Sequence, residues 1–335
     1  MTRVAVVGGG AWGTTLADLL ARKGEFAAVT LWAREPEVVA GVNRDHVNSL
    51  FLPGAALAPA LRATGEVTET VEGADVVVSA APSHAVRAVM TQAAPALGRG
   101  ALVVSVSKGL EPDRLSTLSC VLAEVLPRGP KIAVLSGPSF AREVYERHPT
   151  AVVAAAQEHA VAQRVQQVFS TNYFRVYSAT DVVGVELGGA LKNVIALAAG
   201  ILEGLGMGYN TRAALITRGL AEIARLGGAL GADPATLAGL AGLGDLVLTA
   251  TGPLSRNHQL GVELGHGKRL EDALAERATV AEGVGTARAA VALGERHDVE
   301  LPIARAVSDV LFHGKPPRVA LSELMERELK REHWR

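Results

Sequence analysis

The sequence predicts an α/β domain with a doubly wound, mostly parallel sheet, followed by an all-α domain. Three observations lead to this prediction. Short β-branched runs alternate with helical patterns in the first half, strand-like runs disappear after about residue 184, and 335 residues exceed what one hydrophobic core usually serves. We therefore expect one domain at residues 1–184 and a second at 185–335.

The strands of the first domain are expected at near-continuous apolar runs, as in a sheet covered on both faces. These runs lie at residues 3–8, 28–34, 74–82, 101–109, 131–139, 150–156 and 173–179. Helical patterns at 13–23, 84–97 and 114–126 lie between them, which makes a βαβ series. In the second domain, helical patterns cover 185–204, 210–231, 287–297 and 303–314.

Composition excludes several classes of protein. With 49% apolar and 20% charged residues, the chain is globular rather than disordered. A net charge of −1 provides no electrostatic case for nucleic acid or for an anionic membrane. The single cysteine, Cys120, excludes an internal disulfide framework and fits a reducing cytoplasm; we expect it to be a buried, small apolar residue.

The apolar run at 187–202 is the candidate for a membrane span. It is shorter than the roughly 20 residues that a spanning helix needs. Lys192 and Asn193 lie near its centre. We therefore expect a buried helix and no membrane insertion. Because the N-terminal residues also show no signal-peptide pattern, a cytoplasmic location is expected.

A glycine-rich turn follows the first predicted strand. Gly8, Gly10 and Gly13 have G-x-G-x-x-G spacing and lead into an apolar-periodic helix. The first glycine permits the tight turn, the second lets a pyrophosphate approach the backbone, and the third allows helix and strand to pack closely. This strand–turn–helix context indicates a dinucleotide site of the Rossmann type. Trp12 projects from the turn, either against the coenzyme or into the core.

The end of the second predicted strand bears on the choice of coenzyme. An acidic residue there typically holds the ribose 2′-hydroxyl of NAD, whereas an arginine favours the 2′-phosphate of NADP. This sequence has Arg34 followed by Glu35. We expect NADP(H) to be preferred, with NAD(H) as the alternative.

Polar residues at the ends of later strands are candidates for a substrate site, because ligands bind beyond the carboxyl ends of such strands. Lys108 is placed to reach an anionic substrate as a point charge. The turn with Gly137 and Ser139 either holds a phosphate or hydroxyl group or is plain turn chemistry. His84 opens a helix, so we expect a cap or surface residue and leave it out of the site.

The helical half has its own candidates. Lys192 is costly to bury unless something pairs with its charge, and Asp245 is placed to orient a hydroxyl or the Lys192 ammonium. Ser255 is a predicted N-cap. Arg256 and Asn257, with free N–H groups at the start of that helix, are suited to a phosphate.

Taken together, four stretches resemble the bacterial NAD(P)-dependent glycerol-3-phosphate dehydrogenases. They are "GGGAWGTTLA", "LSGPSFAREV", "GALKNVIALAAG" and "GLGDLVLTATGPLSRN", with "ATVAEGV" at 278–284. The resemblance implies reduction of dihydroxyacetone phosphate to sn-glycerol 3-phosphate, the backbone precursor of phospholipids. It implies no metal, and we expect a homodimer.

The resemblance also implies roles for individual residues, with Lys192 as the proton-transferring residue. The residues implied for the substrate are Lys108, Gly137, Ser139, Asp245, Ser255, Arg256 and Asn257. Those implied for the coenzyme, besides Gly8 and Gly10, are Ala11, Trp12, Arg34, Lys108, Ala141, Arg256, Val280 and Glu282. Ala11 and Phe51 stand where a hydroxyl residue and a tyrosine are frequent in the family.

Two alternatives compete with this interpretation. One is another two-domain dehydrogenase that acts on a β-hydroxy acid or a 2-oxo acid and therefore holds a carboxylate. The other is a non-catalytic NADP(H)-sensing protein, which has no need of Lys192 in an apolar helix.

Overall fold

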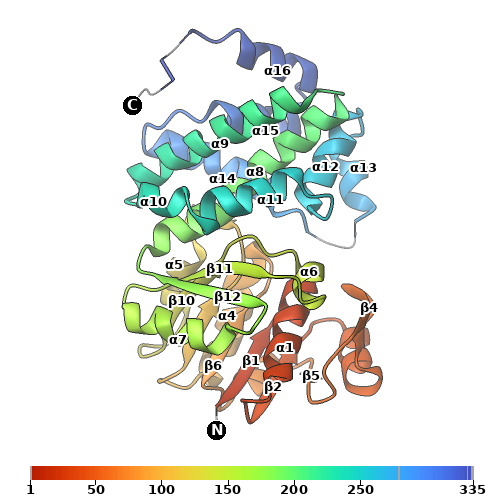
Figure 1. The fold of residues 1–335 in the computed structure, drawn as a ribbon, viewed down its shortest axis with the longest axis vertical. Coiled ribbons are helices and arrows are strands. Elements are labelled where there is room, and N and C mark those ends of the chain that lie inside the picture. The colour runs from red at the N-terminus through yellow and green to blue at the C-terminus, as the bar shows by residue number, and fades with distance from the viewer. Residues whose placement is uncertain (1, 278–279, 330, 333–335) are drawn as a thin grey trace. The chain divides into compact units, whose positions relative to one another are not determined.

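A computed structural model describes residues 2–277, 280–329 and 331–332, and it divides the chain into two compact units (Figure 1). The first unit comprises Met1–Lys108 and Ser116–Val182. The second comprises Gly109–Leu115 and Val183–Arg335. The chain thus contributes a seven-residue segment to the second unit before the first unit is complete.

The first unit is built on an eight-stranded sheet with the order β12-β11-β10-β7-β6-β1-β2-β5. Its strands are β1 (Arg3–Val7), β2 (Ala28–Trp32), β5 (Arg62–Thr64), β6 (Val76–Ser79), β7 (Leu102–Ser105), β10 (Lys131–Ser136), β11 (Thr150–Ala155) and β12 (Phe174–Ala179). Every neighbouring pair is parallel except β10 and β11. This confirms the predicted mostly parallel sheet.

Alternating residues of the strands enter two different cores. Val4 and Val6 pack on the face that α1 (Ala11–Lys23) and α7 (His159–Phe169) cover. Ala5 and Val7 pack on the opposite face. That face is covered by α3 (Val67–Val71), α4 (Val86–Ala93) and α5 (Leu118–Val125). Burial on both faces is why these strands read as continuous apolar runs rather than alternating ones.

Several short elements, most of them in this unit, carry no periodic signal in the sequence. The strands are β3 (Val47–Asn48), β4 (Leu52–Ala56), β8 (Leu110–Glu111) and β9 (Ser116–Thr117). The helices are α2 (Pro36–Ala40), the π-helix Gly41–Asp45, the 3₁₀ turns Ser83–Ala85 and Ala94–Ala96, and α6 (Ala141–Tyr145). The edge strand β5 was also not predicted. Elements of two to five residues are too short for periodicity to reveal.

In the part of the second unit that the structure describes, the elements are helical apart from β8, as predicted. Its helices are α8 (Val182–Gly204), α9 (Tyr209–Ala229), α10 (Pro234–Leu237), the π-helix Leu240–Gly244, α11 (Asp245–Thr251), α12 (Arg256–Gly265), α13 (Leu270–Ala275), α14 (Glu282–Arg296), α15 (Pro302–Phe312) and α16 (Pro317–Met325). The core of this unit forms around α8, whose residues are buried on all sides from Leu187 to Leu202.

Glycines allow α8 and α12 to approach closely. A Cβ atom at Gly200 would overlap the backbone of His258, and one at Gly261 would overlap the backbone of Leu197. Gly204 and Gly265 meet in the same way one turn further along. The absence of side chains at these four positions brings the two backbones into direct contact, which fixes α12 against the central helix.

Two expectations need correction. The helix that contains the apolar run 187–202 is 23 residues long, so length does not exclude a membrane span as expected. Two stretches of the described residues have sufficient length and hydropathy; Val182–Gly204 is 89% buried within the protein, as in a core helix, and Pro234–Thr251 is 39% buried. Cys120 is exposed rather than buried, near the start of α5.

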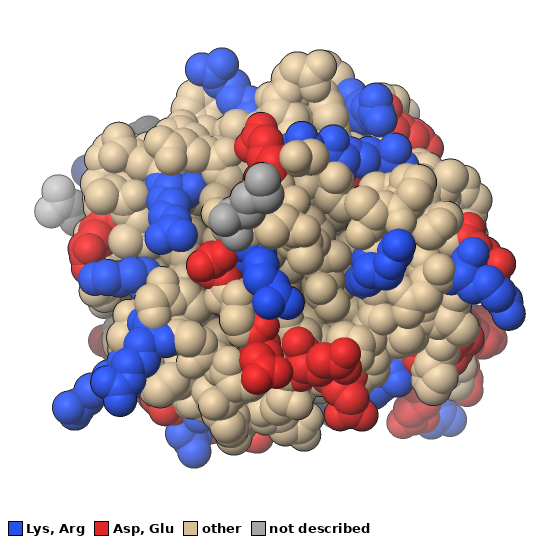
Figure 2. All heavy atoms as spheres, turned by 90° about the horizontal axis from the view of Figure 1, so that it is seen from below, with Lys and Arg blue, Asp and Glu red and all other residues tan. Residues whose placement is uncertain are grey.

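On the face that Figure 2 shows, basic and acidic side chains are interspersed.

Candidate active site

The glycine turn joins β1 to α1 in the first unit. Gly8 has φ +139°, a conformation that side chains rarely allow. A Cβ atom at Gly13 would overlap the Gly8 carbonyl oxygen, whereas one at Gly10 would meet open space. No side chain caps α1, and its first turn has no acidic residue. The turn therefore offers uncapped N–H groups and a positive helix end beside an open backbone position, which fits a dinucleotide pyrophosphate.

Three other predicted coenzyme residues of this unit lie around the turn or at a strand end. Trp12 packs against the core, with its ring 6.3 Å from that of Phe174, and its buried indole N–H has no partner among the described residues. The Ala141 carbonyl accepts a hydrogen bond of 3.2 Å from the Thr15 hydroxyl of α1. Arg34 follows β2 and is 82% exposed, with its guanidinium donating to the Glu35 carboxylate at 2.8 Å.

The ends of β7 and β10 come together through Lys108. Its Nζ donates to the Gly137 carbonyl at 2.7 Å and to Ser139 Oγ at 3.2 Å. Gly137 has φ +140°, and a Cβ atom at this position would also overlap Val152, so both the backbone conformation and the packing favour glycine. The structure thus groups the three predicted substrate residues of this unit, with an ammonium and a hydroxyl at a parallel-strand end. His84 is exposed, in keeping with a surface residue.

Lys192 lies in α8 and is 5% exposed, so its charge does not extend to solvent. Its Nζ donates to Asp245 Oδ1 at 2.7 Å and to Thr249 Oγ1 at 2.6 Å. Asp245, at the start of α11, is 1% exposed. A buried ammonium is tolerated here because a carboxylate neutralises it and a hydroxyl accepts a second hydrogen bond. The structure therefore brings together the predicted lysine and aspartate.

Thr249 was missed by the sequence analysis. It lies four residues after Asp245, one helical turn further along α11. Its hydroxyl donates to the Asp245 backbone carbonyl at 2.7 Å and accepts from Lys192. The signal that could have identified it is the Asp-x-x-x-Thr spacing, which places both side chains on one face of a helix.

A buried amide network links three helices beside Lys192. Asn257 Nδ2 donates to Asn193 Oδ1 at 2.9 Å, and Asn257 Oδ1 accepts from the Gly283 N–H at 2.9 Å. Asn193 therefore contacts neighbouring helices. The side-chain oxygen of Asn257 is engaged with the protein, although its amide nitrogen carries a second hydrogen. Ser255 caps α12, accepting from the His258 N–H at 3.2 Å, as predicted.

Arg256 begins α12 and is exposed at the surface. Although the residue is exposed, the protein around its guanidinium removes enough water to lower the pKa of Arg256 from the ordinary value, while the Glu282 carboxylate acts in the opposite direction. An arginine nevertheless stays charged at physiological pH. Val280 is exposed and Glu282 is the first residue of α14. The first two residues of the "ATVAEGV" stretch, 278–279, lie outside the described residues.

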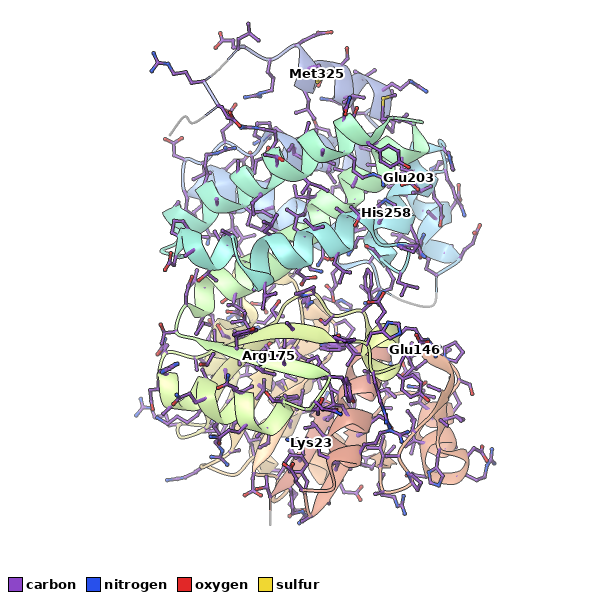
Figure 3. The ribbon with its side chains drawn as sticks, viewed as in Figure 1. Lys23, Glu146, Arg175, Glu203, His258 and Met325 are labelled. Carbon is purple, nitrogen blue, oxygen red and sulfur yellow. The ribbon has the colours of Figure 1, made fainter. Side chains whose placement is uncertain are left out.

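A histidine lies directly after the Ser-Arg-Asn stretch. His258 is buried, with Nε2 3.5 Å from the Glu203 carboxylate at the end of α8, and the two side chains lie side by side (Figure 3). Desolvation lowers the pKa of His258, Glu203 raises it and Arg212 lowers it. A neutral imidazole at neutral pH follows, so His258 adds no charge beside Arg256.

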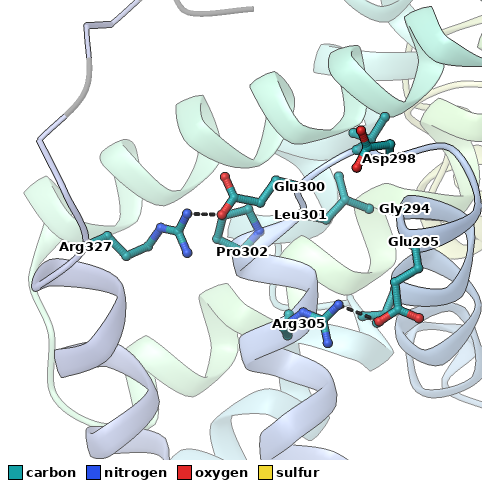
Figure 4. Close-up of a pocket in the computed structure, with 10 residues that line it drawn as sticks. Gly294, Glu295, Asp298, Glu300, Leu301, Pro302, Arg305 and Arg327 are labelled. Carbon is teal, nitrogen blue, oxygen red and sulfur yellow. Dashed lines mark hydrogen bonds and ion pairs between the residues drawn. The ribbon is translucent and has the colours of Figure 1, made fainter.

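Two cavities of the helical unit are separate from these residues. One, of about 270 Å³, is bordered by the Glu300–Arg327 and Glu295–Arg305 ion pairs (Figure 4). The other, of about 500 Å³, is lined by both apolar and charged residues, most of which belong to α9, α15, α16 and the segment that follows α16. Neither is lined by a residue that the sequence analysis assigned to coenzyme or substrate.

Comparison with known families covers both units. The family model described as NAD-dependent glycerol-3-phosphate dehydrogenase N-terminus matches residues 3–162. The corresponding C-terminus model matches residues 181–322.

Similar proteins agree with this result. Glycerol-3-phosphate dehydrogenase (NAD(P)+) from Geobacter sulfurreducens is 57% identical over 336 residues, covering 99% of each chain. The protein of that name from Geobacter metallireducens is 56% identical over 334 residues, or 98% of each. The solved structure of glycerol-3-phosphate dehydrogenase from Coxiella burnetii is 38% identical, with a TM-score of 0.93 over 97% of this chain and 99% of that one. The chain therefore belongs to the NAD-dependent glycerol-3-phosphate dehydrogenase family.

Proposed function

We propose that Lys192 is the proton-transferring residue in the reduction of dihydroxyacetone phosphate to sn-glycerol 3-phosphate. The chain is an NAD(P)-dependent glycerol-3-phosphate dehydrogenase, as family membership over both units implies. The observation that carries the proposal for Lys192 is its burial between Asp245 and Thr249. A buried ion pair is weak evidence for a stabilising role, whereas the reduction of a carbonyl needs a proton donor or a positive group at the ketone oxygen, which Lys192 can supply.

The chemistry follows from the charge that develops on the substrate. When bound, the reduced nicotinamide supplies the hydride. As the carbonyl carbon gains an electron pair, negative charge builds on the ketone oxygen, and the Lys192 ammonium offers both a positive field and a proton there. Transfer of that proton leaves a neutral amine on Lys192 and a hydroxyl on the product. In the oxidative direction the same amine accepts the proton.

Asp245 and Thr249 act on Lys192 rather than on the substrate in this proposal. The Asp245 carboxylate holds the ammonium charged, and the Thr249 hydroxyl fixes its direction by a second hydrogen bond. Two of the three ammonium hydrogens are therefore engaged by these two groups. In the complex with substrate, the ketone oxygen would receive its hydrogen bond from this same ammonium group.

The substrate phosphate requires cations and N–H donors. The residues that we propose for it are Lys108, Gly137, Ser139, Ser255, Arg256 and Asn257. Arg256 supplies a permanent charge at the start of α12, where backbone N–H groups add a positive helix end. The Ser255 side chain is engaged as the cap, so its contribution would be to position that turn.

The coenzyme would be held by the glycine turn with Gly8, Gly10, Ala11 and Trp12, and by Ala141, Val280 and Glu282. A nicotinamide coenzyme of the NAD(P) class is implied by the family. We propose that NADP(H) is preferred, because the exposed Arg34 guanidinium follows β2 and the 2′-phosphate of NADP(H) binds beyond the end of that strand. Glu35 beside it would serve the 2′-hydroxyl of NAD(H).

Three further parts of the proposal concern the protein in the cell. Exposed apolar side chains of the helical unit, among them Tyr209 and Met325, support a homodimer. The single exposed thiol of Cys120 supports a reducing, cytoplasmic location. The product would supply the glycerol backbone for phospholipid synthesis.

A substrate panel tests the function. NADPH and NADH oxidation are followed with dihydroxyacetone phosphate and, separately, with 2-oxo acids of similar size. We expect turnover with the phosphorylated ketone alone. Activity confined to 2-oxo acids would favour the alternative dehydrogenase, and tight NADPH binding without any turnover would favour a sensor; either result contradicts the proposal.

A further inference from the structure

We propose that Asn48 is a positioning residue for the coenzyme, acting through the carbonyl of Gly9. This inference rests on the proposed role of the glycine turn as the coenzyme site. Asn48 ends the short strand β3 and is fully buried, and the sequence analysis assigned it no role. A buried amide persists in a core only where its donors and acceptor are satisfied.

The side chain of Asn48 closes a small hydrogen-bond network on the turn. Its Nδ2 donates to the Gly9 carbonyl at 2.8 Å and to Thr14 Oγ1 at 2.8 Å. The Thr14 hydroxyl in turn donates to the same Gly9 carbonyl at 3.0 Å. The Gly9 carbonyl thus accepts two buried hydrogen bonds, one from Asn48 and one from Thr14. Gly9 lies between the first two glycines of the motif.

The orientation of this carbonyl determines the orientation of the next N–H group. The peptide between Gly9 and Gly10 is trans, so its C=O and N–H bonds point in opposite directions. With the Gly9 carbonyl held toward Asn48 and Thr14, the Gly10 N–H is directed away from them. Gly10 is the N-cap of α1 and borders open space, which is where phosphate oxygens would receive N–H donors.

The same amide also anchors the segment that supplies it. Asn48 Oδ1 accepts from the Phe51 N–H at 3.1 Å, in the turn between β3 and β4. A second tie joins this segment to α1, where Asp18 Oδ1 accepts from the Ala58 N–H at 2.6 Å. Removing Asn48 therefore leaves the segment attached but removes one of the two side-chain hydrogen bonds that orient the Gly9 carbonyl. This separation allows the positioning role to be tested apart from folding.

The test compares Asn48→Ala with Asn43→Ala. Asn43 lies five residues earlier and also makes two side-chain hydrogen bonds, to the backbone N–H and carbonyl of Ala63. Neither of these hydrogen bonds involves the glycine turn, so Asn43 serves as the matched control. Dissociation constants for NADPH and NADH are measured by fluorescence titration, and the coenzyme-induced shift in Tm is measured in parallel.

We expect Asn48→Ala to weaken binding of both coenzymes at least tenfold, with kcat at saturating coenzyme changed less than threefold. Asn43→Ala should bind coenzyme as the unchanged chain does. Thr14→Val, which removes the second donor to Gly9, should weaken coenzyme binding in the same direction. Asn48→Asp keeps the acceptor for Phe51 but loses the donor to Gly9, so it should not restore binding.

Unchanged coenzyme binding in folded Asn48→Ala would overturn the inference. So would an equal loss in Asn43→Ala, because that would indicate general loosening of the segment. If Asn48→Ala does not fold, unchanged binding in Thr14→Val overturns it instead. Absence of coenzyme binding by the unchanged chain would refute the proposed function itself, a result distinct from these.

Discussion

At the scale of single residues, two buried charged groups are accommodated in different ways. Lys192 has both a carboxylate and a hydroxyl partner within the core of the helical unit. Glu222 of α9 is the contrasting case, since it is buried and accepts only backbone N–H groups, from Ile303 and Ala304 at the start of α15. It caps that helix from a neighbouring one, with Arg225 and Arg327 as the positive groups acting on it.

Glu222 makes stability depend on pH. Burial raises the pKa of Glu222 from 4.5 to about 7. The folded state therefore binds this proton more tightly than the unfolded state, and the stabilisation present below pH 4.5 is lost as pH rises through about 7. A shift of this size corresponds to about 3 kcal/mol. In urea unfolding at pH 5 and pH 8, Glu222→Gln should lose less stability between the two pH values than the unchanged chain.

The control for this measurement is Glu271→Gln, whose carboxylate is 77% exposed. It should leave the pH dependence unchanged. An identical pH profile for Glu222→Gln and the unchanged chain would show that this carboxyl does not titrate between those values.

Arg34 determines coenzyme preference in the present proposal. Arg34→Ala should raise the Kd for NADPH about tenfold or more, because a charge-assisted contact to the 2′-phosphate is lost, and should alter the Kd for NADH less than twofold. Arg44→Ala is a matched control, since Arg44 is also exposed and also pairs with the acidic residue after it. Equal losses for both coenzymes in Arg34→Ala would refute the assignment.

At the scale of elements, the contact between α8 and α12 positions the Ser-Arg-Asn stretch against the helix that carries Lys192. Gly261→Ala places a methyl group into the backbone of α8, so we expect a loss of about 1–3 kcal/mol in the free energy of unfolding. Gly228→Ala, in an open position of α9, should be neutral or stabilising, because alanine favours helix. Chemical denaturation compares the two; equal stability would contradict the close packing.

How far elements could be predicted depended on length and burial. The longer strands and helices, from β1 to α15, could be predicted because the sequence shows continuous apolar runs or helical periodicity there. Segments such as β5 and the β3–β4 hairpin were missed because a few residues carry no period. Asn48 lies in that hairpin, so its hydrogen bonds to the glycine turn had no signal in the sequence. The sequence also did not indicate that Gly109–Leu115 belongs to the helical unit, because Leu110 and Leu115 look like ordinary apolar residues in the sequence.

The candidate site was predicted unevenly for a physical reason. Glycines and an isolated charge in an apolar helix stand out in a sequence, so Gly8, Gly13 and Lys192 were found. Thr249 is a small polar residue of a helix, and only the tertiary contact with Lys192 distinguishes it from any other threonine. The prediction for Cys120 was wrong for a different reason: cysteine is usually buried, but this cysteine is exposed on α5.

At the scale of the whole molecule, the proposed homodimer predicts the mass of the protein particle in solution. Light scattering after gel filtration should give about twice the 34.7 kDa of one chain. Exposed apolar residues of the helical unit are the physical reason to expect association. A mass of one chain at every concentration tested would contradict the dimer and leave the catalytic proposal unaffected.

The central claim is that the whole chain works as a dehydrogenase through one buried ammonium group. The most direct measurement is kcat for dihydroxyacetone phosphate reduction by Lys192→Met, with the Kd for NADPH measured on the same sample. Lys23→Met is the control, since Lys23 also has a largely buried side chain but bonds only backbone carbonyls of Gln167 and Val168 and the Glu25 carboxylate. We predict that kcat falls about 10²- to 10⁴-fold in Lys192→Met while NADPH binds normally. Turnover within a few-fold of the unchanged chain would contradict the account.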